Sequence, residues 1–320
     1  MQLKDAKVIF MGTSLFAREV LKDLLEKNTN IDLVITQPDR PAGRKKTLQS
    51  PDVKNLALEE GLNLKQFSEL KEEEIDFIKK QSPDLIIVAS YGLIIPEKVL
   101  DIPRFGCVNI HPSLLPNLRG PSPIQTALWQ NLKKTGVTFI KMTPGIDAGP
   151  IFFQKSININ PDDIYPVLKK KLINLTKKFL TDSLEKYLNN KVVLKEQDHQ
   201  KATLTKLITK KDGRIFWSSP AEEIYNKFRA FYGWPGIYSF IKTERFYKKI
   251  SFWEISYRQE NPEEKDLSPG KVFEDSKNQV AIKTGKGIVI PLEIQLEGKK
   301  SMSIKDFTNG QPNFTESLLE

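Results

Sequence analysis

The 320-residue sequence has very little cysteine and histidine, and this scarcity excludes several kinds of site. With Cys107 as its single cysteine, the chain can form no intramolecular disulfide, which suits a reducing compartment. The two histidines, His111 and His199, lie far apart in the sequence and form no Cys/His cluster with zinc spacing. Because Cys107 lies in a short apolar run, we interpret it as a core residue rather than a nucleophile. We therefore expect no metal site and no disulfide.

Long apolar segments are also missing. The longest nearly apolar run, residues 85–95, is much shorter than the roughly 20 residues that a membrane-spanning helix needs. The N-terminal residues carry no apolar stretch typical of a secretory signal. We therefore expect a cytoplasmic protein with no membrane partner.

Two common nucleotide-binding patterns are absent. Gly12 alone follows the first expected strand, so the G-x-G-x-x-G pattern of dinucleotide-binding proteins is not formed. Residues 43–47 resemble the end of a Walker A motif but lack its leading glycine spacing. The sequence therefore argues against both kinds of phosphate-binding loop.

Positive charge is what the sequence has in excess. Its 49 Lys and Arg residues against 40 Asp and Glu residues give a net charge of +9. The excess is concentrated in residues 191–250, which carry +7, whereas residues 251–320 carry −3. Such a basic stretch is compatible with an anionic partner, and equally with a solvated lysine-rich surface.

The first half of the chain alternates strand-like and helix-like segments. Its strand-like segments are almost fully apolar, which indicates strands covered on both faces and hence a parallel sheet with helices on each side. These segments are residues 8–11, 31–36, 84–89, 107–110 and 136–142. Their order predicts an α/β fold with an open, mostly parallel, Rossmann-like sheet.

The remainder predicts one long helix, a linker and a second, smaller domain. Residues 162–190 carry apolar side chains every three or four positions, the pattern of one buried helix face. Residues 191–207 are polar and irregular, whereas residues 208–320 contain short apolar runs separated by glycines, which is typical of a small β-barrel. We therefore expect a first domain over 1–190, a linker over 191–207 and an OB-like β-barrel domain over 208–320.

Asn109 and His111 are the most informative polar residues, because they end an apolar strand. In an extended chain they project to the same side, roughly 6.6 Å apart. Both side chains can donate a hydrogen bond to an oxyanion, and the imidazole can also move a proton. Since open α/β sheets bind ligands at the carboxyl ends of their strands, the pair favours an acyl-transfer site. The alternative is a pair of turn residues that cap the strand.

Asp147 is the third candidate. It lies in a loop after the strand-like segment 136–142, and Gly145 and Gly149 let the backbone turn its carboxylate inward. A carboxylate beside an imidazole favours the protonated ring and fixes its tautomer. On the sequence alone, Asp147 is equally compatible with an ordinary turn residue.

The order and spacing of these residues resemble one known family. The segment 109–116, followed by Arg119-Gly120 and by the Gly-Ile-Asp-x-Gly loop at 145–149, is similar to the signature of the folate-dependent formyltransferases. The resemblance extends along nearly the whole chain and includes the members that act on methionyl-tRNA. Further matching segments are 12–13, 37–44, 91–96, 123–125, 212–217 and 229–236.

The resemblance implies a reaction and a role for each candidate. The formyl group of 10-formyltetrahydrofolate, the co-substrate, would pass to the α-amino group of methionine on initiator tRNA. Asn109 and His111 would bind the oxyanion of the tetrahedral intermediate. Asp147 would orient His111 and help to remove the amine proton.

The resemblance also implies binding residues for both substrates. The folate would lie against the loop at 113–116, with its pterin beside the backbone at 91–93. The tRNA would contact the basic loop at 37–50. The folate-binding residues would be Ser113, Leu114, Leu115, Pro116, Tyr91, Gly92 and Leu93. The tRNA-binding residues would be Arg40, Arg44, Lys45 and Lys46, with Arg44 matching the key arginine of the family. Without the resemblance, the basic loop is interpreted as a solvated surface loop.

Two other functions remain open on the sequence. One is a formyltransferase for a small amine such as an amino-sugar nucleotide, and the other is an RNA-binding protein that retains the fold without activity. Arg44 and the basic stretch favour tRNA over a small amine, and the presence of Asn109, His111 and Asp147 argues against an inactive protein. We expect a monomer, and we expect His199 to be solvent-exposed without a role.

Overall fold

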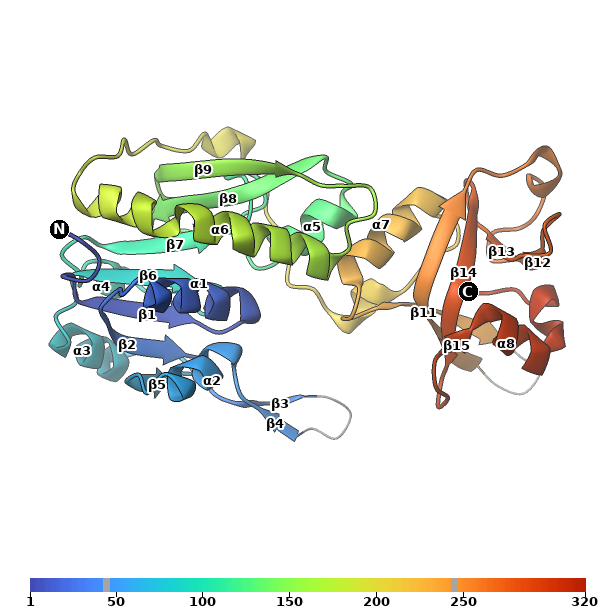
Figure 1. Cartoon of the computed structure of the whole chain (residues 1–320). Helices are drawn as coiled ribbons and strands as arrows, with labels where there is room; N and C mark the ends of the chain where they lie inside the picture. Colours follow the sequence, from blue (N-terminus) through green and yellow to red (C-terminus); the bar gives the residue numbers. More distant parts are fainter. Residues whose placement is uncertain (43–46, 243–246) are drawn as a thin grey trace. The chain divides into compact units, whose positions relative to one another are not determined.

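The structure is a computed structural model that describes residues 1–42, 47–242 and 247–320. The chain divides into two compact units (Figure 1). The first unit consists of Met1–Pro123, Lys134–Asn158 and Lys169–Lys206. The second unit consists of Ile124–Lys133, Ile159–Leu168 and Leu207–Glu320.

The first unit is built on a seven-stranded sheet. In spatial order its strands are β5 (Leu64–Gln66), β2 (Ile31–Thr36), β1 (Val8–Gly12), β6 (Leu85–Ala89), β7 (Cys107–His111), β8 (Lys134–Lys141) and β9 (Ile151–Asn158). The strands from β5 to β7 pair in parallel, whereas β8 pairs antiparallel with β7 and with β9. The predicted α/β sheet is therefore confirmed, with antiparallel pairing at one edge.

Helices cover both faces of this sheet (Figure 1). They are α1 (Leu15–Glu26), α2 (Asp52–Glu59), α3 (Glu72–Lys80), α4 (Glu97–Leu100) and α6 (Tyr165–Leu188). On one face, Ile9 of β1 packs in a cluster with Ile78 of α3 and Val99 of α4. Phe10, which points to the opposite face, is equally buried, and α1 contacts β1 and β6. Burial on both faces explains why these strands are continuous apolar runs.

Cys107 begins β7 and lies in this core, as predicted. Its thiol lies 3.7 Å from the carbonyl oxygen of Val99, and burial raises the pKa of the thiol to about 12. The reactive thiolate is therefore nearly absent at neutral pH. We expect the native protein to react with a disulfide reagent about 10³-fold more slowly than the unfolded chain, as followed by absorbance. Equal rates for native and unfolded protein would contradict the core assignment.

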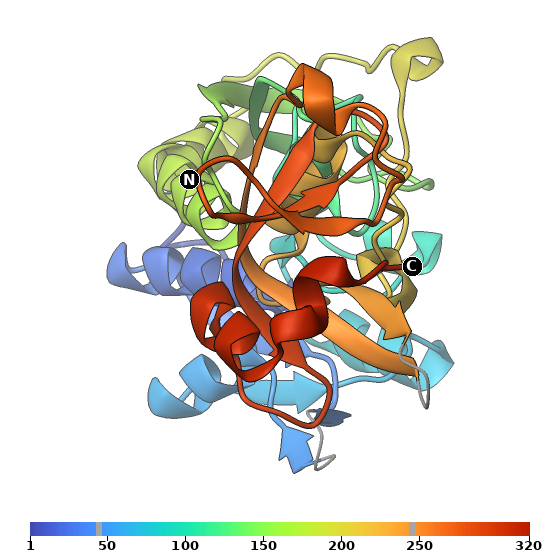
Figure 2. The same ribbon diagram turned by 90° about the vertical axis from the view of Figure 1, so that its right-hand side faces the viewer.

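The second unit contains a six-stranded antiparallel sheet (Figure 2). In spatial order its strands are β10 (Ile237–Lys242), β11 (Tyr247–Arg258), β14 (Ile288–Leu296), β13 (Val280–Lys283) and β12 (Val272–Glu274), and β15 (Met302–Ser303) also pairs with β14. The remaining helices are α5 (Pro123–Trp129), α7 (Ala221–Phe231) and α8 (Ile304–Gly310). The short strands predicted for residues 208–320 are therefore present.

The C-terminal residues 317–320 hydrogen-bond to both end strands of this sheet. Phe240 of β10 donates its backbone N–H to the carbonyl of Glu320 at 3.2 Å and accepts from the N–H of Glu320 at 2.9 Å. At the other end of the sheet, the N–H of Val272 in β12 donates to the carbonyl of Ser317 at 3.0 Å. The tail therefore pairs backbone groups that would otherwise be exposed at the sheet edges.

Candidate active site

The predicted pair Asn109 and His111 lies on β7, at the edge where the parallel strands end. Side chains two positions apart on a strand project to the same face, so both side chains reach the same space. Thr138 of β8 pairs directly opposite His111. Asn109 is 9% exposed and His111 is 4% exposed, so their polar atoms need partners within the protein.

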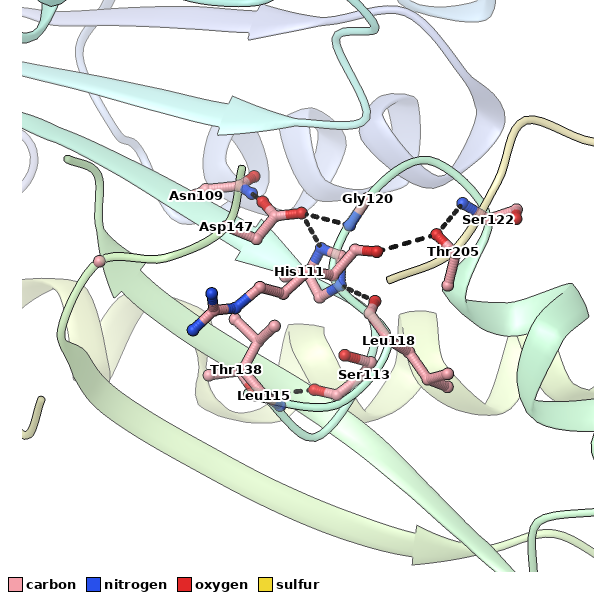
Figure 3. A network of polar contacts seen from close by, with 12 residues as sticks. Asn109, His111, Ser113, Leu115, Leu118, Gly120, Ser122, Thr138, Asp147 and Thr205 are labelled. Atoms are coloured by element: carbon pink, nitrogen blue, oxygen red, sulfur yellow. Dashed lines mark hydrogen bonds and ion pairs between the residues drawn. The ribbon is translucent and has the colours of Figure 1, made fainter. Parts of the chain in front are cut away.

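Asp147 is the partner that both side chains share (Figure 3). Nδ2 of Asn109 donates to Oδ1 of Asp147 at 2.8 Å, and the backbone N–H of Gly120 donates to Oδ2 at 2.8 Å. Nδ1 of His111 lies 3.5 Å from the same Oδ2. The structure therefore brings the three predicted residues into one cluster in which nitrogen atoms surround the carboxylate.

A backbone carbonyl fixes the orientation of the His111 ring (Figure 3). Nε2 of His111 lies 2.9 Å from the carbonyl oxygen of Leu118. Because a carbonyl oxygen only accepts, Nε2 carries a hydrogen. Nδ1 then faces the carboxylate of Asp147, and this contact is favourable when a proton lies between them. The ring is therefore held between the carbonyl oxygen of Leu118 and the carboxylate of Asp147.

The backbone of the Asp147 loop is unusual. Asp147 has a φ of +47°, in the left-handed region that residues other than glycine rarely adopt. Gly145 has a φ of +111°, and a Cβ at Gly149 would lie 1.9 Å from the carbonyl oxygen of Lys141. The two glycines therefore act differently, since Gly145 supplies a backbone angle and Gly149 permits close approach of β8.

The loop after β7 contains four of the predicted folate-binding residues. The hydroxyl of Thr138 donates to the carbonyl of Ser113 at 2.6 Å and accepts from the N–H of Leu115 at 3.2 Å. Ser113 and Leu115 are buried, whereas Leu114 and Pro116 are half-buried. Leu114 and Pro116 therefore have exposed side-chain surface for a ligand, while Ser113 and Leu115 hold the loop in place.

Tyr91, Gly92 and Leu93 follow β6 at the same edge of the sheet. The side chain of Tyr91 lies in the core, where burial raises the pKa of its hydroxyl. Its carbonyl oxygen accepts from Oγ1 of Thr13 at 2.8 Å and from Nε2 of Gln37 at 2.7 Å. Gly92 has a φ of +83°. Gln37, directly after β2, belongs to the matching segment 37–44 but was not among the predicted folate-binding residues.

Residues 195–206, inside the predicted linker, form a segment that we call the strap. The N–H of Arg119 donates to the carbonyl of Thr203 at 2.9 Å, and the N–H of Thr205 donates to the carbonyl of Arg119 at 2.7 Å. The strap therefore pairs with the loop that contacts His111 and Asp147. His199 is exposed, as expected, and its Nδ1 lies 3.1 Å from Nη2 of Arg119. Sequence reasoning missed these contacts because the segment has no periodic apolar pattern.

The predicted tRNA-binding loop is described in part. Arg40 is exposed and begins β3 (Arg40–Ala42), which pairs antiparallel with β4 (Thr47–Gln49). The predicted residues Arg44, Lys45 and Lys46 lie outside the described residues.

In the described part of the chain, no three His, Cys, Asp or Glu side chains are grouped so that they could hold a metal ion. Across residues 1–42, 47–242 and 247–320, no helix is long and apolar enough to cross a membrane.

Comparison with known sequences decides the family. A model of the formyl transferase family matches residues 6–184, and a model of the formyl transferase C-terminal domain matches residues 207–312. A methionyl-tRNA formyltransferase of Caldicellulosiruptor saccharolyticus is 41% identical over 306 residues, which cover 95% of this chain and 96% of that protein. The chain belongs to the methionyl-tRNA formyltransferase family. Another relative of that name, from Thermotoga neapolitana, is 42% identical over 307 residues and 95% of each chain.

Solved structures of other proteins share the fold of this formyltransferase. An N-formyltransferase from Helicobacter canadensis, in complex with folinic acid and dTDP-3-aminofucose, has a TM-score of 0.62 at 18% identity and covers 89% of this chain and 99% of its own. HypX from Aquifex aeolicus, in complex with tetrahydrofolic acid, has a TM-score of 0.61 at 16% identity and covers 95% of this chain and 47% of its own. At these identities the likeness concerns the fold alone.

Proposed function

We propose that this formyltransferase transfers the formyl group of 10-formyltetrahydrofolate to the α-amino group of methionyl initiator tRNA, giving N-formylmethionyl-tRNA. The observation that carries the proposal is the cluster of Asn109, His111 and Asp147 at the end of β7. It occurs in a chain that is 41% identical to a methionyl-tRNA formyltransferase over 95% of its length. A site of this kind needs neither a nucleophilic side chain nor a metal ion.

The reaction moves the formyl carbon from N10 of the folate to the amine nitrogen of methionine. The neutral amine attacks the formyl carbon, and the formyl oxygen becomes an oxyanion. The intermediate then collapses, the bond to N10 breaks, and N10 takes up the proton that the amine has released to Asp147. Asn109 is the proposed oxyanion donor, because Nδ2 carries two hydrogens and its bond to Asp147 uses one of them. A donor that is already in place lowers the barrier without reorganisation.

His111 and Asp147 are the proposed proton-handling groups. The 3.5 Å contact between Nδ1 of His111 and Oδ2 of Asp147 is longer than an ordinary hydrogen bond, so an incoming group can compete for the proton on Nδ1. A protonated Nδ1 beside the formyl oxygen stabilises its negative charge. Asp147 then accepts the amine proton, directly or through a water molecule.

The folate is proposed to lie between the two loops at the carboxyl edge of the sheet. Leu114 and Pro116 offer half-buried apolar surface, while Ser113 and Leu115 keep their loop in shape. The pterin would hydrogen-bond to the backbone at 91–93. Gly92 has a φ of +83°, and a Cβ there would lie 2.5 Å from Nε2 of Gln37.

Arg44 is proposed to contact the tRNA, together with Arg40, Lys45 and Lys46. We expect Arg44→Ala to lower kcat/KM for methionyl-tRNA by about 10-fold or more, because a charge-assisted contact to phosphate is lost. The KM for 10-formyltetrahydrofolate should stay within about twofold. Arg104→Ala is the matched control. Arg104 is exposed, and its backbone N–H donates to the carbonyl of Pro83. Pro83 and Arg104 precede the N-terminal ends of β6 and β7, whereas the candidate site lies at their C-terminal ends. A loss confined to folate affinity would contradict the assignment of the loop.

We further propose that residues 208–320 form an OB-like barrel that binds the tRNA backbone, and that the enzyme works as a monomer in the cytoplasm. The antiparallel sheet with both end strands hydrogen-bonded by residues 317–320 supports a barrel. The charge of +7 over residues 191–250 supports an anionic partner.

A formylation assay with purified protein, 10-formyltetrahydrofolate and methionyl initiator tRNA tests the proposal. Formylmethionyl-tRNA should form in the complete mixture and in none of the mixtures that contain free methionine or uncharged tRNA. Failure to form product while folate still binds would instead support the small-amine formyltransferase.

A further inference from the structure

Gln197 of the strap lies 50 positions after Asp147, yet its side chain contacts the backbone of the Asp147 loop. Nε2 of Gln197 donates to the carbonyl of Asp147 at 2.8 Å and to the carbonyl of Gly149 at 2.7 Å. Its Oε1 accepts from Nη2 of Arg119 at 2.7 Å and from Nε at 3.2 Å. Gln197 is 5% exposed and Arg119 is 7% exposed, so these bonds form away from bulk solvent.

The chemistry of the partners allows one orientation of this amide. Carbonyl oxygens only accept hydrogen bonds and a guanidinium group only donates them, so Nε2 must face the carbonyls and Oε1 must face Arg119. Both hydrogens and both acceptor positions of the amide are then used. A buried polar group with every bond satisfied holds its neighbours rigidly.

The two sides of the Gln197 amide hold the two loops that build the active site. On one side is Asp147, whose left-handed backbone persists only if surrounding contacts enforce it. On the other side is Arg119, which lies between Leu118 and Gly120. The carbonyl of Leu118 orients His111, and the N–H of Gly120 donates to the carboxylate of Asp147. Beside them, Lys195 and Ile151 exchange backbone hydrogen bonds at 2.8 Å each, which anchors the strap.

We propose that Gln197 is a positioning residue that holds the carboxylate of Asp147 against His111 and Asn109. The inference rests on the proposed formyl transfer and extends it to a residue that touches neither substrate. Its side chain bonds to the backbone of the catalytic loop, so its loss should slow the chemical step rather than weaken binding.

Two substitutions at Gln197 remove its donors in different ways. Gln197→Glu keeps the acceptor for Arg119 but turns a carboxylate oxygen toward the two carbonyls, and Gln197→Met removes all four bonds at similar volume. We expect either change to lower kcat by about 10²-fold, because a small displacement of a catalytic group has an effect of this order. KM for both substrates should change less than about threefold. Gln200→Glu is the matched control, because Gln200 is exposed on the same strap.

A double-mutant cycle with Asp147→Asn separates positioning from a general structural role. If Gln197 acts through Asp147, adding Gln197→Glu to Asp147→Asn should lower single-turnover rates less than about threefold further. Equal losses in both backgrounds, or a loss that matches the fraction of unfolded protein by circular dichroism, would overturn the inference. The wild-type protein is assayed first, because an inactive wild-type protein would refute the proposed function. If the wild-type protein is active, additive losses of the single-turnover rate refute only the positioning role of Gln197.

Discussion

Replacing Asp147 with asparagine is expected to lower kcat by roughly 10³-fold or more, since the same change in a carboxylate that orients the catalytic histidine of a serine protease lowers kcat by about 10⁴-fold. The two side chains have nearly the same shape, so packing is preserved. Oδ1 of Asp147 faces Nδ2 of Asn109, and Oδ2 faces the N–H of Gly120 and Nδ1 of His111. Either orientation of an amide would therefore set its NH₂ group against a nitrogen donor. The carboxylate is also the proposed acceptor of the amine proton, and an amide cannot replace it there.

The Asp147→Asn experiment needs a steady-state assay with both substrates varied. KM values should remain close to those of the wild type, since Asp147 is assigned to the chemical step. Asp266→Asn, at an exposed position of the second unit, makes the same charge change away from the site. Retention of more than a tenth of wild-type kcat in Asp147→Asn would be incompatible with the proposed proton handling.

Asn109→Ala should give the second largest effect, a fall in kcat of about 10²- to 10³-fold, as measured for the loss of one oxyanion donor in other enzymes. The substitution removes the proposed donor to the formyl oxygen. It also removes one of the hydrogen bonds that hold the carboxylate of Asp147. Because the oxyanion exists only along the reaction path, binding of tRNA and of folate should be nearly unchanged.

Rapid-quench single-turnover assays together with equilibrium tRNA binding measure both parts of this prediction. Asn55→Ala, on the exposed face of α2, is the matched control. If Asn109→Ala weakened tRNA binding and left the single-turnover rate at saturation intact, Asn109 would be a binding residue and the oxyanion assignment would be wrong.

The fold of the first unit could be predicted largely because burial leaves a simple pattern. The strands β1, β6 and β7 are buried at every position, and their mostly apolar runs indicated a sheet covered on both faces. Strand β9 was not predicted, because it lies at the edge of the sheet and Gln154, Lys155 and Ser156 are exposed. An edge strand with polar residues lacks the apolar run on which the prediction depended.

The active site was predictable where its geometry is local. Asn109 and His111 share a strand, and the period of two places them on one side. Asp147 stood out through its flanking glycines and the family resemblance. Gln197 could not be found in this way, because its contacts with Asp147 and Arg119 join residues 50 and 78 positions apart. Such contacts depend on how loops fold back over the sheet, and the local sequence pattern does not predict this.

The most direct test of the proposed function is a competition assay with one preparation of the wild-type protein. Radiolabelled 10-formyltetrahydrofolate would be offered to methionyl initiator tRNA and dTDP-3-aminofucose in the same tube, and both formylated products would be counted. The proposed function predicts label in formylmethionyl-tRNA, and loss of that label in Asp147→Asn. Label in the amino sugar alone, or tRNA formylation that persists in Asp147→Asn, would contradict it.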